Sequence, residues 1–315
     1  MLISIVIPVY KSSLTLRELA QRTQRVFEGL EGYDYEIVFV NDSPHFPATC
    51  ETLAALAKDN QRVIAIELTK NFGQQPATLC GIEYAHGDYV VTMDDDLQHA
   101  PEDIPLLLKK ASHDAVIARF RVKHHSIFKR ATSKMKGFFD TIILGKPASL
   151  SLSPFRLLKA QVAKFMLKRN TPYPFIPALL FEVTEDVVNV DVEHHPRFDG
   201  AGHYSLLRMI RVFSNLLVSN SSLLLRMVGY SGFLVAFIAF LYALVIGFRA
   251  TFFGVPVAGW PSTFTAILFF GGMTLLTLGI VGEYLIRIIA TTEQRPTYYV
   301  RSVVGIAQHD AHEGH

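Results

Sequence analysis

The sequence predicts an α/β domain built on a parallel sheet, followed by two hydrophobic helices. Short apolar runs alternate with segments of helical spacing in the first part of the chain, and two long stretches without charge follow. Continuous apolar runs are typical of parallel strands that helices cover on both faces. About 20 apolar residues are enough to cross the hydrocarbon layer of a bilayer. The 315 residues, 50% of them hydrophobic, therefore fit one medium-sized domain and a membrane anchor.

Four strands are expected in order along the first part of the chain, at 2–9, 35–40, 63–68 and 88–93. Each is followed by apolar residues at helical spacing. The first run, MLISIVIPVY, lacks the basic region and the cleavage site of a signal peptide. We therefore interpret it as a buried strand.

Charge and cysteine content narrow the class of protein. The net charge of +2 gives no indication of a nucleic-acid partner. Cys50 and Cys80 form no CxxC motif and no disulfide framework, which favours a reducing compartment.

The four predicted strands end at residues that offer aromatic, amide, basic and acidic groups, at the edge where parallel sheets bind their ligands. These residues are Pro8 and Tyr10, Asn41 and Asp42, Lys70 and Asn71, and Asp94, Asp95 and Asp96. The chain has no GxGxxG and no GxxxxGK[ST] motif. Bound phosphates are therefore not expected to lie on a glycine-rich loop.

The acidic segment MDDDLQH predicts a site for a divalent cation. On an extended backbone Asp94, Asp96 and Gln98 share one face, and Asp95 and Leu97 the other. Mg²⁺ or Mn²⁺ is commonly held by one or two carboxylates together with substrate phosphates. The alternative is an acidic cap on the helix that follows. The position at a strand end favours the metal.

Several segments together resemble the family 2 glycosyltransferases. They are SIVIPVY, VND, NFGQ, MDDDLQH, HPR with a later GHY, and GEYLIRI with a later RP. More narrowly, the chain is similar to the polyprenyl-phosphate glycosyltransferases, over nearly its whole length to about Val304. The resemblance implies a GT-A (Rossmann-like) fold, a nucleotide-sugar donor, a divalent metal, a lipid-phosphate acceptor and a homo-oligomer, specifically a tetramer.

The resemblance also implies roles for individual residues. Asp94 and Asp96 would be catalytic and would hold the metal together with Gln98. Donor binding is implied for Pro8, Tyr10, Asn41, Asp42, Lys70, Asn71 and Asp95, although a structural role for Asp95 stays open. Acceptor binding is implied for Arg119, Arg130, Arg197 and His203.

Three departures from the family pattern concern the donor and acceptor loops. The segment NDSP at 41–44 lacks the usual glycine and the later acid. GHY at 202–204 stands where the family has SKY, and Pro154 stands where an acid or serine is usual. The identity of the sugar therefore stays open.

The two uncharged stretches predict the remaining organisation. We expect a catalytic domain at 1–203, an amphipathic juxtamembrane helix at 204–222, transmembrane helices at 223–248 and 263–290, an extracytoplasmic loop at 249–262 and a cytoplasmic tail at 291–315. The alternatives are core-packed helices, both for the amphipathic segment and for the two spans.

Lys and Arg set the expected orientation in the membrane. Arg208 and Arg211 precede the first span and Arg226 lies near its start. Arg287 lies near the end of the second span, and Arg295 and Arg301 follow it. The connecting loop carries only Arg249. The positive-inside rule then places both termini in the cytoplasm. We expect a multi-pass protein of the inner membrane with its catalytic domain in the cytoplasm.

The predicted activity is the inverting transfer of a sugar, UDP-linked in its donor, to undecaprenyl phosphate. Two alternatives stay open. A processive polysaccharide synthase shares the acidic motif but usually has a QxxRW motif, which this chain lacks. An inactive membrane scaffold or lipid-carrier binding protein finds support only in the altered NDSP loop.

Overall fold

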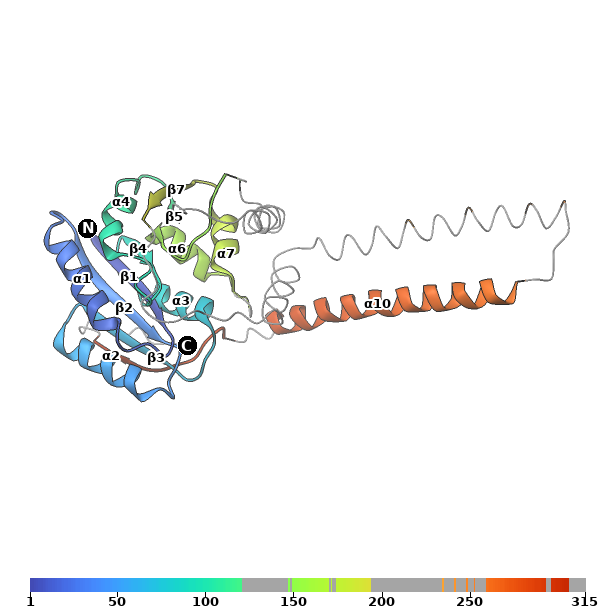
Figure 1. Cartoon of the computed structure of the whole chain (residues 1–315), viewed down its shortest axis with the longest axis horizontal. Helices are drawn as coiled ribbons and strands as arrows, with labels where there is room; N and C mark the ends of the chain where they lie inside the picture. Colours follow the sequence, from blue (N-terminus) through green and yellow to red (C-terminus); the bar gives the residue numbers. More distant parts are fainter. Residues whose placement is uncertain are drawn as a thin grey trace. The chain divides into compact units, whose positions relative to one another are not determined.

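The computed structural model describes residues 1–120, 147, 149–169, 171, 174–193, 234, 241, 248, 252, 259–292 and 296–305. The chain divides into two compact units. One comprises Met1–Tyr204 with Arg295–His315, and the other comprises Ser205–Gln294. The first unit contains the sheet and its helices, and the second contains the long helix α10 (Trp260–Thr292) (Figure 1).

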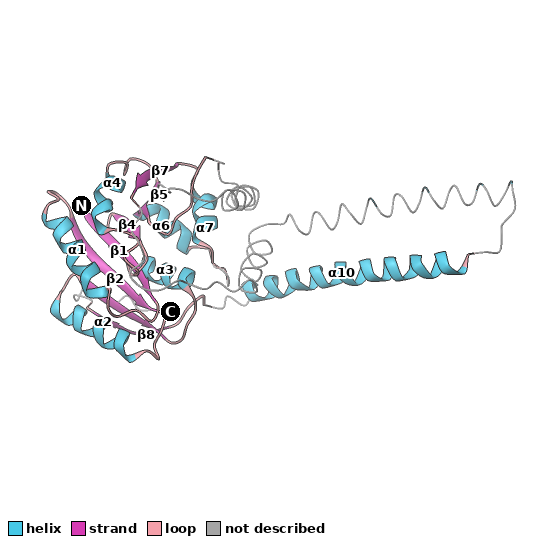
Figure 2. Cartoon of the chain, in the orientation of Figure 1, coloured by secondary structure: helices cyan, strands magenta, loops and turns pink. Residues whose placement is uncertain are grey.

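The four strands predicted from the sequence form the parallel part of the sheet. They are β1 (Leu2–Val9), β2 (Asp34–Asn41), β3 (Val63–Leu68) and β4 (Tyr89–Thr92). β1 lies between β2 and β4 (Figure 2), and β3 pairs with β2; every one of these pairings is parallel. Their continuous apolar sequences bury both faces of these strands, as parallel strands require.

The expectation of an entirely parallel sheet is wrong. The sheet that the described residues form has the order β7-β5-β6-β4-β1-β2-β3-β8. β6 (Arg156–Lys159) runs antiparallel to β4 and β5 (Ala115–Phe120), and β8 (Val300–Val304) runs antiparallel to β3; β7 (Val187–Val192) is parallel to β5. Strands as short as β6, or as polar as VRSVV in β8, show too little pattern to be classified from sequence.

Helices cover both faces of the sheet and form two hydrophobic cores. One core joins odd-numbered residues of β1 to α1 (Leu16–Glu28), α2 (Pro47–Asp59) and α4 (Ile104–Leu108), which follows a 3₁₀ turn at Pro101–Asp103. The other core joins Val6, Val38 and Val40 to α3 (Gln74–Glu83), α6 (Ala160–Leu167) and α7 (Ile176–Val183). The alternation of strand side chains between the two faces explains this division.

Gly81 allows α3 to pack unusually close to the sheet. A Cβ atom at this position would lie 2.3 Å from Cγ1 of Val6 and 3.1 Å from Cγ2 of Val40. Atoms at such distances overlap, and a well-packed core can accommodate them only with a loss of stability. The close approach fixes α3, and with it Gln74 at its first turn, against β1 and β2.

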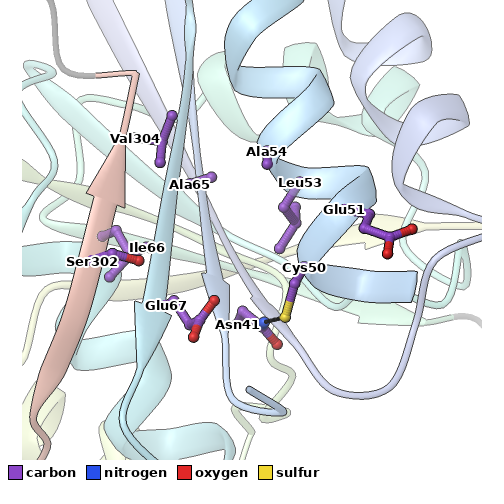
Figure 3. A pocket seen from close by; sticks show the side chains of 10 residues that line it. All are labelled: Asn41, Cys50, Glu51, Leu53, Ala54, Ala65, Ile66, Glu67, Ser302 and Val304. Atoms are coloured by element: carbon purple, nitrogen blue, oxygen red, sulfur yellow. Dashed lines mark hydrogen bonds between the residues drawn. The ribbon is translucent and has the colours of Figure 1, made fainter. Parts of the chain in front are cut away.

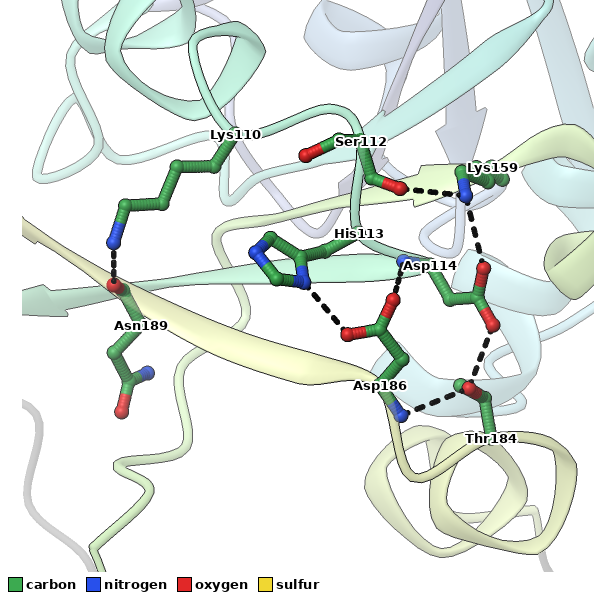
Figure 4. A network of polar contacts seen from close by, with 8 residues as sticks. All are labelled: Lys110, Ser112, His113, Asp114, Lys159, Thr184, Asp186 and Asn189. Atoms are coloured by element: carbon green, nitrogen blue, oxygen red, sulfur yellow. Dashed lines mark hydrogen bonds and ion pairs between the residues drawn. The ribbon is translucent and has the colours of Figure 1, made fainter.

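A polar network joins the loops at the amino-terminal ends of β5 and β7 (Figure 4). Asp114 accepts hydrogen bonds from Thr184 Oγ1 (2.7 Å) and Lys159 Nζ (3.0 Å), and these contacts lower the pKa of Asp114. Nδ1 of His113 lies 2.6 Å from Oδ1 of Asp186. The network lies at the sheet edge opposite the polar strand ends, so we interpret it as structural.

The second unit is described mainly through α10, a helix of 33 residues with exposed apolar side chains such as Ile267 and Phe269. Among the described residues, no helix combines the length and the hydropathy needed to span a bilayer. The predicted helix 204–222 lies outside those residues, and the predicted span 223–248 is described at three positions only. α10 begins at Trp260, within the loop predicted at 249–262.

Candidate active site

The strand order places the predicted polar residues at one edge of the sheet. β4, β1, β2 and β3 are neighbours in that order, and Val9 pairs with Asn41 at the carboxyl ends of β1 and β2. Open α/β sheets bind ligands at such an edge. The groups that follow the four strands therefore share one candidate site.

The acidic segment does not continue β4 as an extended strand, so that expectation is wrong. β4 ends at Thr92, and the chain turns after it. Leu97 is buried and adopts a left-handed backbone with φ of 62°. The backbone amide of Gln98 donates to Oδ1 of Asp96 (3.1 Å). Burial of the leucine and the local carboxylate–amide bond override strand geometry here.

Asp94 is held by two neighbours. Its Oδ1 accepts a hydrogen bond from Nε2 of Gln74 (2.5 Å), and its backbone amide donates to Nδ1 of His99 (2.9 Å). His99 is buried, with its ring stacked 5.4 Å from those of Phe120 and Phe155. Sequence reasoning missed both supports, although Gln74 lies in NFGQ and His99 ends MDDDLQH.

The carboxylates of this segment repel one another. Burial, then the charges of Asp96 and Asp95, raise the pKa of Asp94 to about 7, and attraction to Arg156 opposes them. Arg156 is only 5% exposed, and burial lowers its pKa to about 10. Its Nε has no hydrogen-bond partner within the described part of the chain. This buried cation was not predicted, although an arginine inside the apolar run PFRLL was a signal for it.

The oxygen ligands at this site fit a cation that is shared with a substrate. Within the described ranges, no three His, Cys, Asp or Glu side chains are grouped to hold a metal ion on their own. Asp94 and Asp96 supply hard carboxylate oxygens, and Gln98 supplies an amide oxygen. Mg²⁺ needs only one or two protein carboxylates when substrate phosphates complete its coordination. Unbalanced negative charge around Asp94 is what such a site requires.

Asn41 and Asp42 are buried and shape the loops around the site. The carboxylate of Asp42 accepts the amides of Phe72 (2.6 Å) and Gly73 (2.8 Å). Burial raises the pKa of Asp42, and these two hydrogen bonds oppose the rise. Oδ1 of Asn41 accepts both the amide and the hydroxyl of Ser43 (2.9 Å each). Asn41 thus closes the NDSP turn that lacks the usual glycine.

The other predicted donor residues lie at the ends of β1, β3 and β4. Asp95 joins two strand ends, because its Oδ2 accepts the Tyr10 amide (3.3 Å) and its carbonyl accepts Oγ1 of Thr15 (2.6 Å). Tyr10 is 52% exposed and Pro8 is half-buried. Lys70 and Asn71 are exposed, and Nζ of Lys70 lies 5.1 Å from the ring centre of Phe72.

The predicted acceptor residues are described for one member only. Arg119 lies in β5, and its Nε donates to Oδ1 of Asp191 in β7 (2.5 Å). Its side chain is 48% exposed. Arg130, Arg197 and His203 lie outside the described residues, so their convergence on one site stays a prediction.

A hollow of about 320 Å³ lies beside this edge, between α2, β3 and β8 (Figure 3). Its lining is Asn41, Cys50, Glu51, Leu53, Ala54, Ala65, Ile66, Glu67, Ser302 and Val304. Nδ2 of Asn41 donates to Sγ of Cys50 (3.2 Å). Two of the lining residues belong to β8, which the sequence did not predict as a strand.

A comparison with protein families decides the assignment. The model of the family described as glycosyl transferase family 2 matches residues 4–167, from β1 to the end of α6. The chain belongs to glycosyltransferase family 2. The strand-end carboxylates thus lie in an enzyme that transfers glycosyl groups.

Full-length relatives narrow the group to the polyprenyl-phosphate glycosyltransferases. An undecaprenyl-phosphate 4-deoxy-4-formamido-L-arabinose transferase of Proteus mirabilis is 34% identical, over 96% of this chain and 94% of its own. A bactoprenol glucosyl transferase of Shigella phage SfX is 32% identical, over 96% of this chain and 99% of its own. The family resemblance read from the motifs is confirmed.

Solved structures support the fold. The glucosyl-3-phosphoglycerate synthase of Mycobacterium tuberculosis, crystallised with Mn²⁺, UDP-glucose and phosphoglyceric acid, aligns with a TM-score of 0.50 at 14% identity. The alignment covers 69% of this glycosyltransferase and 77% of that chain. At this identity the match bears on the fold alone, and it supports the GT-A-like mixed sheet.

Proposed function

We propose that this glycosyltransferase moves a sugar from a nucleotide-sugar donor, UDP-linked, to undecaprenyl phosphate for a cell-envelope glycan or lipid. The Asp94–Asp96 cluster at the strand ends carries the proposal. The names of the relatives that match almost the whole chain supply the acceptor. Those relatives move different sugars, so the proposal covers the acceptor class and leaves the sugar open.

The proposed chemistry is a single displacement at the anomeric carbon. A phosphate oxygen of the lipid forms the new bond to that carbon, and the bond to the donor diphosphate breaks, so the nucleoside diphosphate leaves with the electron pair. One displacement inverts the anomeric configuration. A phosphate monoester has its second pKa at about 6, so the nucleophile is largely dianionic at neutral pH. The enzyme then needs no strong general base.

The main task of the protein is to hold two anionic substrates together. Asp94, Asp96 and Gln98 would hold a divalent cation, Mg²⁺ or Mn²⁺, which when bound neutralises charge on the leaving diphosphate. Gln74 and His99 fix the orientation of Asp94. Arg119, with Arg130, Arg197 and His203, would bind the lipid phosphate and offset its repulsion from the donor.

Donor binding is proposed for the groups around the NDSP and NFGQ loops. Tyr10, Lys70 and Asn71 present exposed side chains at the strand ends. Asn41 and Asp42 would act mainly by holding the loop backbone, because their side-chain oxygens already accept backbone hydrogen bonds. Pro8 and Asp95 complete this set.

A product assay tests the proposed function. Membranes that contain the protein, incubated with Mn²⁺, undecaprenyl phosphate and a panel of radiolabelled UDP-sugars, are expected to yield a labelled lipid that mild acid hydrolyses to free sugar. A labelled polymer would instead indicate a polysaccharide synthase. Release of no product from any donor would contradict the proposal, provided that a known bactoprenol glucosyltransferase is active in parallel.

We also propose that the enzyme is a multi-pass inner-membrane protein with its catalytic domain and both termini in the cytoplasm. The charge-free sequence on both sides of Arg249 and the exposed apolar side chains of α10 support this. A homo-oligomer, a tetramer by family resemblance, stays a prediction.

A reporter fusion tests the orientation. Alkaline phosphatase, which is active only outside the cytoplasm, is expected to be silent when fused after His315 and active when inserted within the 249–262 loop. The insertion serves as the control for expression and export. Strong activity of the C-terminal fusion would contradict the orientation, and with it a cytoplasmic donor site.

A further inference from the structure

The segment Thr69–Gln74, called here the donor loop, is attached to three other parts of the catalytic unit. Its amides at Phe72 and Gly73 donate to Asp42, and the side chain of Gln74 donates to Asp94. Gly73 has a φ of 98°, which favours glycine. The loop therefore links the buried acid after β2 to the acidic cluster after β4.

The third attachment comes from β8 and the residue that precedes it. The carbonyl of Tyr299 accepts the Thr69 amide (2.9 Å), just after the last β3–β8 pair. The guanidinium of Arg301 donates through Nη1 to Oε1 of Glu67 (2.9 Å) and through Nη2 to the carbonyl of Thr69 (3.1 Å). One side chain thus joins β8 to the last part of β3 and to the first residue of the donor loop.

Aromatic contacts continue this attachment. The ring centres of Tyr299 and Phe72 lie 6.1 Å apart. Nζ of Lys70 lies 5.1 Å from the ring centre of Phe72. The hydroxyl of Tyr298 donates a short hydrogen bond to Glu83 of α3. Tyr298, Tyr299 and Arg301, which lie in or just before β8, therefore contact both the start of the donor loop and the end of α3.

We propose that Arg301 is a positioning residue for the nucleotide-sugar donor, acting through the donor loop. This rests on the proposed function, because it assumes that the donor binds at the strand ends. Arg301 touches no atom of the candidate cluster. It fixes the Thr69 carbonyl, and the following residues then present Phe72 and Gly73 to Asp42 and Gln74 to Asp94. Without this fixed point, the loop is expected to sample other conformations, and donor binding bears the entropic cost of ordering it.

The chain offers a matched control in Arg62. Nε of Arg62 pairs with Oδ1 of Asp34 at 3.0 Å, across the opposite end of β2. The side chains of Arg62 and Arg301 are similarly exposed, at 53% and 45%. Both make one carboxylate pair on the same sheet, and Arg62 also lies 5.3 Å from the ring centre of Tyr35. Arg62→Ala therefore measures at least the effect of losing a surface ion pair. Only Arg301 also contacts the donor loop.

The experiment compares Arg301→Ala, Arg301→Lys and Arg62→Ala in the full-length protein. UDP affinity in the presence of Mn²⁺, KM for the donor, KM for undecaprenyl phosphate and Tm are measured for each. Arg301→Ala is expected to weaken UDP binding and raise the donor KM about fivefold, with the acceptor KM and Tm as in Arg62→Ala. Arg301→Lys should recover only part of the loss, because an ammonium cannot serve both oxygens with the geometry of a guanidinium.

Each outcome bears on one claim. If wild-type protein binds UDP and Arg301→Ala binds it equally well, the positioning role is wrong. It is also wrong if donor and acceptor KM rise together, or if Tm falls well below that of Arg62→Ala, because a general structural role predicts those results. If the wild type itself binds no nucleotide, the proposed function fails instead.

Discussion

Asp94→Asn is expected to reduce sugar transfer by about a thousandfold or more while the protein stays folded. Asparagine has the same shape and can still accept the hydrogen bond from Gln74, so the local geometry is kept. It loses the charge that a divalent cation needs, and a loss of this kind in a metal-assisted transfer costs several factors of ten. The measurement is the initial rate of labelled lipid formation with Mn²⁺. Asp59→Asn, at an exposed position at the end of α2, is the matched control.

The same variant is expected to be more stable than the wild type in metal-free buffer at pH 8. The pKa of Asp94 lies at about 7 in the folded protein, above its ordinary value of 3.8. The folded state therefore holds this proton more tightly than the unfolded state does. Ionising the group costs stability, which falls between about pH 4 and 7 and stays lowered above pH 7. Asparagine avoids that cost, so Tm at pH 8 should rise by a few degrees.

Two results would contradict this account of Asp94. Wild-type activity in Asp94→Asn would remove it from the catalytic site. A Tm of Asp94→Asn below that of the wild type at pH 8, by the same amount as at pH 5, would show that the ionised carboxylate stabilises the folded state. The combination of lost activity and gained stability is what distinguishes a functional cluster from an acidic helix cap.

The parallel half of the sheet was predictable because its strands are apolar on both faces. The runs SIVIPV and EIVFV are so apolar that burial is expected, and the segment between them carries apolar residues at helical spacing. β6 and β8 were not predictable in this way. β8 is an edge strand whose residues are mostly exposed or half-exposed, and it pairs with β3 from more than two hundred positions away. Nothing local in VRSVV specifies that partner.

The candidate site was predictable in composition but not in conformation. Strand ends and acidic residues indicated where the cluster lies. The turn at Leu97, the support from His99 and the buried charge of Arg156 all depend on tertiary contacts, which override the extended pattern of MDDDLQH. The engagement of Asp42 with backbone amides likewise depends on where the donor loop passes. Residues that hold other side chains or loops in place need not follow a helical or strand periodicity, so the sequence pattern does not reveal them.

Arg119→Ala is expected to raise KM for undecaprenyl phosphate by about tenfold to thirtyfold, with little change in UDP affinity. Charge-assisted contacts between arginine and phosphate are about twice as strong as neutral hydrogen bonds. Arg119 pairs with Asp191 across the β5–β7 pair, and half of its side chain is exposed. The lipid phosphate would therefore have to share the guanidinium with this carboxylate. The measurement is a pair of titrations, of acceptor at saturating donor and of UDP without acceptor.

Asp191→Asn separates acceptor binding from a merely structural ion pair. If the pair only ties β5 to β7, both variants lose its charge–charge attraction, and both should show small losses of Tm with unchanged kinetics. If Arg119 binds the acceptor, the two variants act in opposite directions. Removing the competing carboxylate charge leaves the guanidinium free for phosphate, so KM for undecaprenyl phosphate should fall or stay level in Asp191→Asn while it rises in Arg119→Ala. Equal acceptor KM values in both variants would exclude Arg119 from the acceptor site, and the lipid phosphate would then have to be bound by the segments beyond β5.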